Sequence, residues 1–364
     1  MAQRTLHLQT TKPMKLAFSG WKTLLLIGLA GLLVTLFLIS LAVGSVAIPL
    51  DDVLRVLTGQ PASKQVWTNI IVNFRLPQAL TAMLAGAALG ISGLLMQTLF
   101  RNPLADPFVL GVSSGASLGV ALIVLTLGSV TTTLLTGLGL LGDVALAGAA
   151  SLGSVAVMVI VLIAARRVSS GATLLIVGLL FGYLTSAFVS VMLYFSIPER
   201  IQAYINWTFG SFSGVTWDQL LVIVPLIAGG LIAAFLLSKS LNALLLGDDY
   251  ALSMGINLRR VRNAVILTAA VLAGTITAFC GPIGFIGIAV PHVCRSLLST
   301  SDHRSLIPFT VLIGALVALV ASIIADVPGS NLVLPLNAVT ALIGAPAVIW
   351  VILSRQSAKE ANAS

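Results

Sequence analysis

Long apolar runs without any charged residue make up most of this sequence. Only 8% of the 364 residues are charged, whereas about a quarter are charged in a typical soluble protein. The mean hydropathy is +1.09. So much apolar surface cannot be hidden in a water-soluble core, and the sequence therefore predicts a protein that lies in the lipid bilayer. For the same reason, the net charge of +8 does not indicate a nucleic-acid partner.

Turn signals divide the apolar runs into ten predicted transmembrane helices, because each crossing needs about 20 residues. The helices are expected at about 24–47, 76–100, 108–127, 143–165, 172–196, 218–238, 263–280, 285–298, 305–325 and 336–354, the eighth being shorter. Ten crossings place both termini on one side of the membrane. The sequence thus predicts an all-α polytopic membrane protein with a single transmembrane domain over 24–354, between cytoplasmic tails at 1–23 and 355–364.

The positions of the basic residues support this topology. With the N-terminus inside, 15 of the 19 lysines and arginines fall in cytoplasmic segments, and only Arg55, Lys64, Arg75 and Arg200 fall outside. This excess is the positive-inside pattern of membrane proteins, and a miscounted helix would have removed it.

The sequence lacks the motifs that would let this chain drive transport or catalyse a reaction by itself. It contains no Gly-Lys pair, and hence no phosphate-binding GxxxxGK loop, and no HExxH motif. Cys280 and Cys294 have no metal-ligand spacing, so buried thiols and no metal site are expected. The acids Asp143, Asp218 and Asp326 map to outer helix ends rather than to the membrane centre, which disfavours ion coupling. An ion-coupled secondary transporter or channel remains the alternative to a chain that is driven by another subunit.

One stretch, LLLGDDYALSMGINLRRVRN at 244–263, concentrates charge between two apolar runs on the predicted cytoplasmic side. Its charged residues are Asp248, Asp249, Arg259, Arg260 and Arg262. An ordinary positive-inside loop would explain the arginines. It would not explain the paired aspartates, which favour a specific short structure.

A second cytoplasmic stretch, QTLFRNPLADPFVLGVSSGA at 97–116, carries the turn residues Arg101, Asn102, Pro103, Asp106 and Pro107. The two prolines are expected to end the second helix and to restart the chain. Asn102 and Asp106 are expected to bond free backbone groups at the turn.

The string FRLPQALTAMLAGAALGISGLLMQTLFRNPLADPFVLGVSSGASLGVAL resembles the signature region of the FecCD family, the permease subunits of ABC importers for ferric siderophores, haem and vitamin B12. The resemblance continues through LLLGDDYALSMGINLRRVRN, GPIGFIGIAVPHVCR, SDHR and NAVTALIGAPAVIWVIL, and covers about 70–354. It implies the type II ABC importer permease fold, with about ten helices, in the bacterial cytoplasmic membrane. An iron chelate is the expected cargo, and vitamin B12 or another metal-containing compound is the alternative.

The resemblance also implies partners. These are a second permease copy or a sister permease, two cytoplasmic ATPase subunits and an extracytoplasmic substrate-binding protein. The chain itself would bind no cofactor and catalyse no reaction, and ATP and magnesium would be used by the ATPase.

In such permeases a coupling helix, here at about 247–256, fits a groove of the ATPase. Gly247, Asp248 and Asp249 are expected to start it, with an aspartate capping its free N–H groups. Ala251 and Gly255 lie four apart and are expected to leave one face flat for close contact. Gly255 is expected to end the helix in a left-handed conformation, and the arginines that follow would lie at the lipid headgroups.

Outer residues of similar permeases contact the binding protein. Arg75 matches the first arginine of an R-L-P-R pattern in the vitamin B12 importer, whereas Gln78 replaces its second arginine and Asp326 replaces a further one. We expect a binding protein with an acid facing Arg75 and a different, basic group near Asp326. The alternative for Arg75 is a side chain that snorkels to the lipid interface.

The resemblance further places the translocation path along the fifth predicted helix. Its candidate lining residues are Phe181, Tyr183, Thr185, Ser190 and Met192. Ordinary packing is the alternative for this methionine and aromatic stripe. The candidate inner gate is Ser169, Ser170 and Gly171.

Overall fold

The computed structural model describes residues 20–126, 140–167, 171–330 and 332–361. Within these ranges the chain forms helices and turns, and no β-strand. A predominantly helical fold suits a chain in lipid, because a helix satisfies its own backbone hydrogen bonds where no water is available.

Each of the ten predicted crossings has a helix at its place. They are α1 (Gly20–Ala42), α4 (Leu76–Leu99), α5 (Val112–Ala121), α7 (Leu140–Arg167), α8 (Gly171–Tyr194), α10 (Trp217–Leu236), α13 (Leu258–Cys280), α14 (Ile286–Leu298), α15 (His303–Ala325) and α16 (Leu336–Ala361). Six helical segments of the described chain are long and apolar enough to cross a membrane, and four further apolar helices are shorter. The number of ten crossings therefore stays a prediction, as does the side on which the termini lie.

Two predicted boundaries differ from the structure. The second helix starts well before 76, because α3 (Gln65–Ile70), the π-helical segment η1 (Ile71–Arg75) and α4 run on without a break. Pro77, the second residue of α4, does not interrupt this helix, because the wider π turn directly before it accommodates a residue that lacks an N–H group. At the other end of the chain, α16 continues to Ala361, so the predicted C-terminal tail begins inside a helix.

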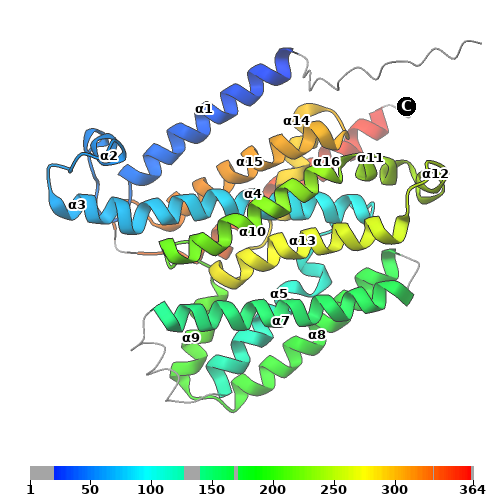
Figure 1. The fold of residues 1–364 in the computed structure, drawn as a ribbon, viewed down its shortest axis with the longest axis horizontal. Helices are drawn as coiled ribbons and strands as arrows, with labels where there is room; N and C mark the ends of the chain where they lie inside the picture. Colours follow the sequence, from blue (N-terminus) through cyan, green and yellow to red (C-terminus); the bar gives the residue numbers. More distant parts are fainter. Residues whose placement is uncertain (1–19, 127–139, 168–170, 331, 362–364) are drawn as a thin grey trace, which may run out of the picture.

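Several short helices accompany the long ones. They are α2 (Leu50–Leu57), η2 (Pro107–Leu110), η3 (Leu122–Thr126), α9 (Pro198–Thr208), α11 (Ser238–Leu246) and α12 (Asp248–Ser253). Only α12 among them was predicted individually, as the coupling helix at about 247–256. In Figure 1, α2 and α3 lie at the left end of the bundle and α12 lies at the right end. The predicted docking residue Arg75 ends η1, which follows α3 directly, so it lies at the opposite end of the bundle from the predicted coupling helix α12.

Helix α4 forms the centre of the larger layer, where α10, α13, α14 and α15 pack around it, while α5, α7, α8 and α9 form a second layer below (Figure 1). Small residues bring the backbones into contact. A Cβ atom placed on Gly86 would lie 2.0 Å from the carbonyl oxygen of Gly314 in α15, and one on Gly93 would lie 1.8 Å from that of Gly287 in α14. Such close approach is the main source of packing energy between helices in lipid.

Candidate functional site

Helices α11 and α12 occupy the charged stretch between α10 and α13. Gly247, with φ of 122°, connects the two helices, and Gly255, with φ of 78°, follows α12. The predicted left-handed conformation of Gly255 is therefore confirmed. The predicted aspartate cap is wrong, because Gly247 takes the N-cap position and no side chain bonds the free N–H groups there.

Asp248 instead forms an ion pair with Arg101 of the turn that follows α4. The Arg101 Nε also donates a hydrogen bond to the carbonyl oxygen of Leu244 in α11, at 3.0 Å. One arginine thus holds both short helices against the end of α4. The sequence predicted the two cytoplasmic stretches separately and did not predict this connection, which joins residues 147 apart.

The face of α12 that points away from the chain differs from the predicted one. Ala251 is 0% exposed and packs inside a small apolar cluster with Ala243 and Leu244 of α11. The predicted flat contact face at Ala251 is therefore wrong, since its own chain covers it. The apolar side chains of Tyr250 and Leu252 are instead exposed, by 49% and 54%.

Exposed residues next to Tyr250 and Leu252 extend this surface. Met254, after α12, is 59% exposed. Asp249 is exposed, as are Arg259 and Arg260 in the first turn of α13. The exposed face around α12 is therefore apolar, with an aspartate and arginines beside it.

The turn at 101–107 has the predicted hydrogen bonds. The Asn102 side chain accepts a hydrogen bond from the Leu104 N–H at 3.0 Å, and the Asp106 side chain accepts one from the Phe108 N–H at 2.8 Å. Pro107 opens η2 and Pro103 lies between α4 and η2, as the sequence indicated. Asp106 is only 7% exposed, and this burial raises its pKa to about 6, although the Phe108 hydrogen bond acts in the opposite direction.

Replacing Asp106 by asparagine is expected to stabilise the permease at neutral pH. A carboxyl whose pKa is raised in the fold costs free energy once it ionises, so the penalty is absent below about pH 4, grows up to about pH 6 and is complete above it, at roughly 3 kcal/mol. The asparagine side chain would keep an acceptor oxygen for the Phe108 N–H without this cost. Melting temperatures in detergent from pH 4 to pH 8 measure the effect.

The control is Asp249→Asn, which removes an exposed carboxyl at the same end of the molecule. It should leave the pH profile of the melting temperature unchanged. A profile for Asp106→Asn that runs parallel to the wild type from pH 4 to pH 8 would contradict the expected ionisation penalty.

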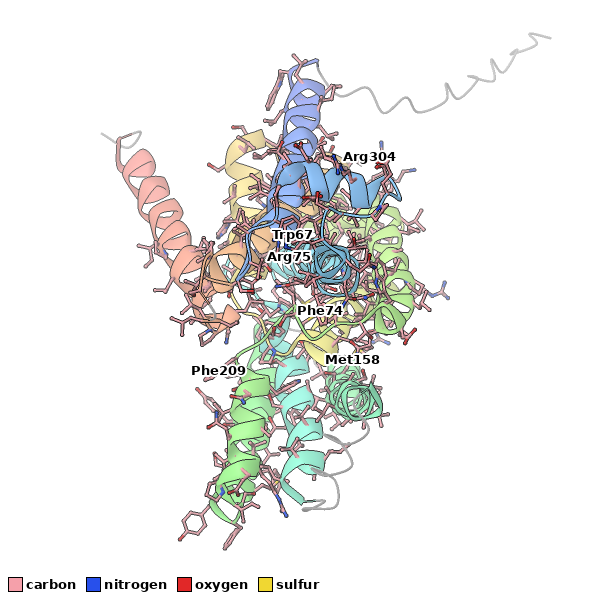
Figure 2. All side chains as sticks on the ribbon, turned by 90° about the vertical axis from the view of Figure 1, so that its left-hand side faces the viewer. Trp67, Phe74, Arg75, Met158, Phe209 and Arg304 are labelled. Atoms are coloured by element: carbon pink, nitrogen blue, oxygen red, sulfur yellow. The ribbon has the colours of Figure 1, made fainter. Side chains whose placement is uncertain are left out.

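At the opposite end, Arg75, Gln78 and Asp326 lie together and line a cavity of about 360 Å³ between α1, α4 and α15. Figure 2 looks onto this end and places Arg75 and Phe74, which both line the cavity, near the middle of the view. The Gln78 Nε2 donates a hydrogen bond to an Asp326 carboxylate oxygen at 2.7 Å. The structure therefore brings together three residues that span about 250 positions in the chain.

The guanidinium of Arg75 faces inward. Its Nη1 donates to the carbonyl oxygens of Leu41 at 2.8 Å and Ala42 at 3.0 Å, and its Nη2 donates to that of Val46. These are carbonyls at and after the end of α1, which no helical N–H group satisfies. Arg75 is only 8% exposed, and its guanidinium bonds backbone carbonyls of its own chain. Its side chain therefore neither lies exposed for docking nor extends to the lipid interface, the two roles considered for it from the sequence. No local pattern indicated this role, because the acceptors are backbone atoms about 30 residues away.

The residues predicted to line the path have different environments on α8. Tyr183 is 66% exposed and Ser190 is also exposed, so both point away from the described part of the chain. Thr185 is buried and donates a hydrogen bond to the Phe181 carbonyl at 2.9 Å, and Met192 packs against the apolar cluster of the second layer. Only part of the predicted set therefore shares the exposed face of α8.

The predicted gate lies at the start of this helix. Gly171 is the first residue of α8, whereas Ser169 and Ser170 lie outside the described residues. The gate assignment therefore stays a prediction.

Comparisons with known proteins agree with this architecture. The profile of the FecCD transport family matches residues 32–354. The vitamin B12 import system permease BtuC of Klebsiella pneumoniae is 38% identical over 328 residues, which cover 90% of this chain and 93% of that protein. The hemin transport system permease HmuU of Yersinia pestis is 36% identical over 323 residues, which cover 88% and 94%.

A solved structure supports the same conclusion at the level of the fold. An inward-facing conformation of a metal-chelate type ABC transporter superposes with a TM-score of 0.79 at 29% identity, over 91% of this chain and 99% of that one. The chain thus belongs to the FecCD transport family and is a multi-pass ABC importer permease of the bacterial inner membrane.

Proposed function

We propose that this permease moves an iron chelate, either a siderophore complex or haem, into the cytoplasm by alternating access. The observation that carries the proposal is an exposed apolar face around α12 at one end of the apolar bundle and a cavity lined by Arg75, Gln78 and Asp326 at the other (Figure 1). The names of the relatives support vitamin B12 as an alternative cargo. Both candidate cargoes, the iron chelate and vitamin B12, are large compounds that contain a metal.

ATPase subunits are proposed to dock at the α12 end. The support is the exposed apolar face of Tyr250, Leu252 and Met254, which no described part of the chain covers. Exposed apolar residues that gather in one place outside the bilayer favour a protein partner. ATP and magnesium would be bound and hydrolysed by that partner, because this sequence has no GxxxxGK loop, and the permease would bind no cofactor of its own.

The substrate-binding protein is proposed to dock at the end that carries α2 and α3. The guanidinium of Arg75 donates its hydrogen bonds to carbonyls at the end of α1, whereas the carboxylate of Asp326 accepts one from Gln78. Asp326 is therefore the cavity residue whose charged group can still accept a hydrogen bond from a partner. A basic side chain of the binding protein would complement it, and charge complementarity of this kind sets partner choice. A structure of the complex with Asp326 distant from the binding protein would contradict this part.

A second copy of the permease is proposed to complete the path. The support is the exposed apolar face of α8, which includes Tyr183, Leu184, Phe188 and Val191 and is not covered by the described chain. A homodimer would place two such faces opposite each other, with Ser169, Ser170 and Gly171 at the inner gate. A sister permease would serve the same purpose.

Reconstitution in liposomes tests the proposed function. The permease, with its cognate ATPase and binding protein, should take up a ferric siderophore, haem or cobalamin only when ATP is present on the side of the membrane that carries the ATPase. The cargo is the compound whose loaded binding protein stimulates ATP hydrolysis. Uptake by the permease alone, driven by a proton gradient, would instead favour a secondary transporter.

A further inference from the structure

Helices α11 and α12 form one mechanical unit. A single residue, Gly247, separates them, and the buried Ala251 of α12 packs on Ala243 and Leu244 of α11. Arg101 adds a hydrogen bond to α11 and an ion pair to α12. A force applied to α12 is therefore carried to α11 through packed side chains and cannot be absorbed by a loose loop between them.

The unit is connected to the long helices by a group of four polar residues, Thr98, Asn242, Asp302 and His303, called here the polar joint. The side-chain oxygen of Asn242, in α11, lies 2.9 Å from the His303 N–H and 2.8 Å from its Nδ1, and the Asn242 Nδ2 donates to Asp302 at 2.6 Å. The His303 Nε2 lies 2.8 Å from the Thr98 hydroxyl. The joint thus connects α11 with the start of α15 and the end of α4.

The donor and acceptor chemistry of these groups fixes which nitrogen of His303 carries the proton. An amide oxygen only accepts hydrogen bonds, so the Nδ1 of His303 carries the proton that points at Asn242. In the neutral ring the Nε2 is then the acceptor for the Thr98 hydroxyl. His303 and Thr98 are each 1% exposed, so water cannot substitute for either partner.

Helices α4 and α15 are in turn fixed to each other along their length. Beyond the polar joint, their backbones touch where Gly86 meets Gly314, and Gln78 of α4 bonds Asp326 at the far end of α15. The far contact lies in the cavity proposed for the binding protein. The pair α4 and α15 therefore spans the distance from the ATPase end to the binding-protein end as one rigid body.

We propose that the polar joint transmits the movement of the docked ATPase through α11 to the α4–α15 pair, and thereby couples the two docking ends. Thr98, Asn242 and His303 are then positioning residues for transport. The inference rests on the proposed function, because it needs partners at both ends. A coupling of this kind is reciprocal for binding: the binding protein changes the affinity for ATP by the same factor by which ATP changes the affinity for the binding protein.

The test compares two threonines of α4 in the assembled transporter with its cognate ATPase and binding protein. Thr98→Val removes the hydroxyl from the joint. Thr81→Val is the matched control, because Thr81 is also buried, at 0% exposed, and its hydroxyl donates only to Pro77 one turn back. Both variants also remove a hydroxyl that lies against the carbonyl one turn back, since the Thr98 Oγ1 is 2.8 Å from the Leu94 carbonyl. The difference between them is the bond to His303, which takes the single proton of the Thr98 hydroxyl in the joint.

Thr98→Val should lower the stimulation of ATP hydrolysis by the binding protein about three- to tenfold, with basal hydrolysis equal to that of Thr81→Val. It should melt somewhat below Thr81→Val, because it leaves the buried Nε2 of His303 unpaired. The ratio of binding-protein Kd values with and without ATP should also shrink. Thr98→Ser keeps the hydroxyl and should restore both the stimulation and the ratio. Asn242→Ala, which breaks the joint from the side of α11, should reproduce the loss.

Equal stimulation ratios in Thr98→Val and Thr81→Val would overturn the inference, and so would a Thr98→Ser variant that behaves like Thr98→Val. A wild-type permease that fails to hold the ATPase, or whose ATPase does not respond to the binding protein, would instead contradict the proposed function itself. The two failures are therefore distinguishable in one set of measurements.

Discussion

Replacing Gly255 by valine is expected to abolish ATP-driven uptake while the permease still folds in the membrane. The φ of 78° at this residue is a conformation that a β-branched residue avoids. Valine would therefore force the backbone at the end of α12 into a different conformation. Apart from its chain neighbours, no atom of the described residues lies within 4 Å of the added Cβ, so the bundle would not be disturbed. Uptake should fall at least about tenfold, because a misplaced contact at a packed interface costs about 1–3 kcal/mol. Uptake and ATP hydrolysis in proteoliposomes measure the uncoupling.

Two variants control for strain alone. Gly255→Asn should retain more of the coupling, since asparagine tolerates a left-handed backbone. Gly59→Val introduces the same strain at the other end, after α2, where φ is 81° and nothing lies within 4 Å of the added Cβ. Because this end is the one proposed for the binding protein, the control is read as uptake per ATP hydrolysed, which should stay at the wild-type value. Normal uptake by Gly255→Val would remove the assignment of α12 as the coupling element.

Replacing Gly93 by alanine is expected to destabilise the fold itself, by about 3 kcal/mol or more. The new methyl group would lie 1.8 Å from the carbonyl oxygen of Gly287, and a backbone atom cannot rotate away as a side chain can. Separating α4 from α14 would also stretch the bonds that the Gln97 amide donates to Gly287 and Ile288, both 3.3 Å long. The yield of monodisperse permease and its melting temperature in detergent measure the loss.

Gly229→Ala is the matched control for this prediction. Gly229 also lies inside a long helix, α10, but outside the backbone of that helix no atom in the described part of the chain lies within 4 Å of a Cβ placed on it. Alanine there should be neutral or stabilise the helix by up to about 1 kcal/mol, because glycine is the poorer helix former. If Gly93→Ala melted at the wild-type temperature, the close contact of α4 and α14 would not be essential for the fold.

The sequence determined those features that depend on neighbouring residues. Apolar run length placed a helix at each of the ten predicted crossings, because the cost of polar backbone in lipid acts on each segment by itself. Turn chemistry likewise acts within a few residues, so Asn102 and Asp106 bond the backbone groups that were expected. Gly255 is left-handed for the same local reason.

Only the tertiary structure decided the partners of the polar and small side chains. Ala251 and Arg75 have the residue types of exposed docking groups, but Ala251 is covered by α11 and Arg75 bonds the end of α1. Asp248 pairs with Arg101 instead of capping α12. Each of these contacts joins residues of different segments of the chain, so no pattern of neighbouring residues predicts it. Which side chains meet depends on how the helices pack. In a bundle held together by close backbone approach, that packing is a property of the whole chain.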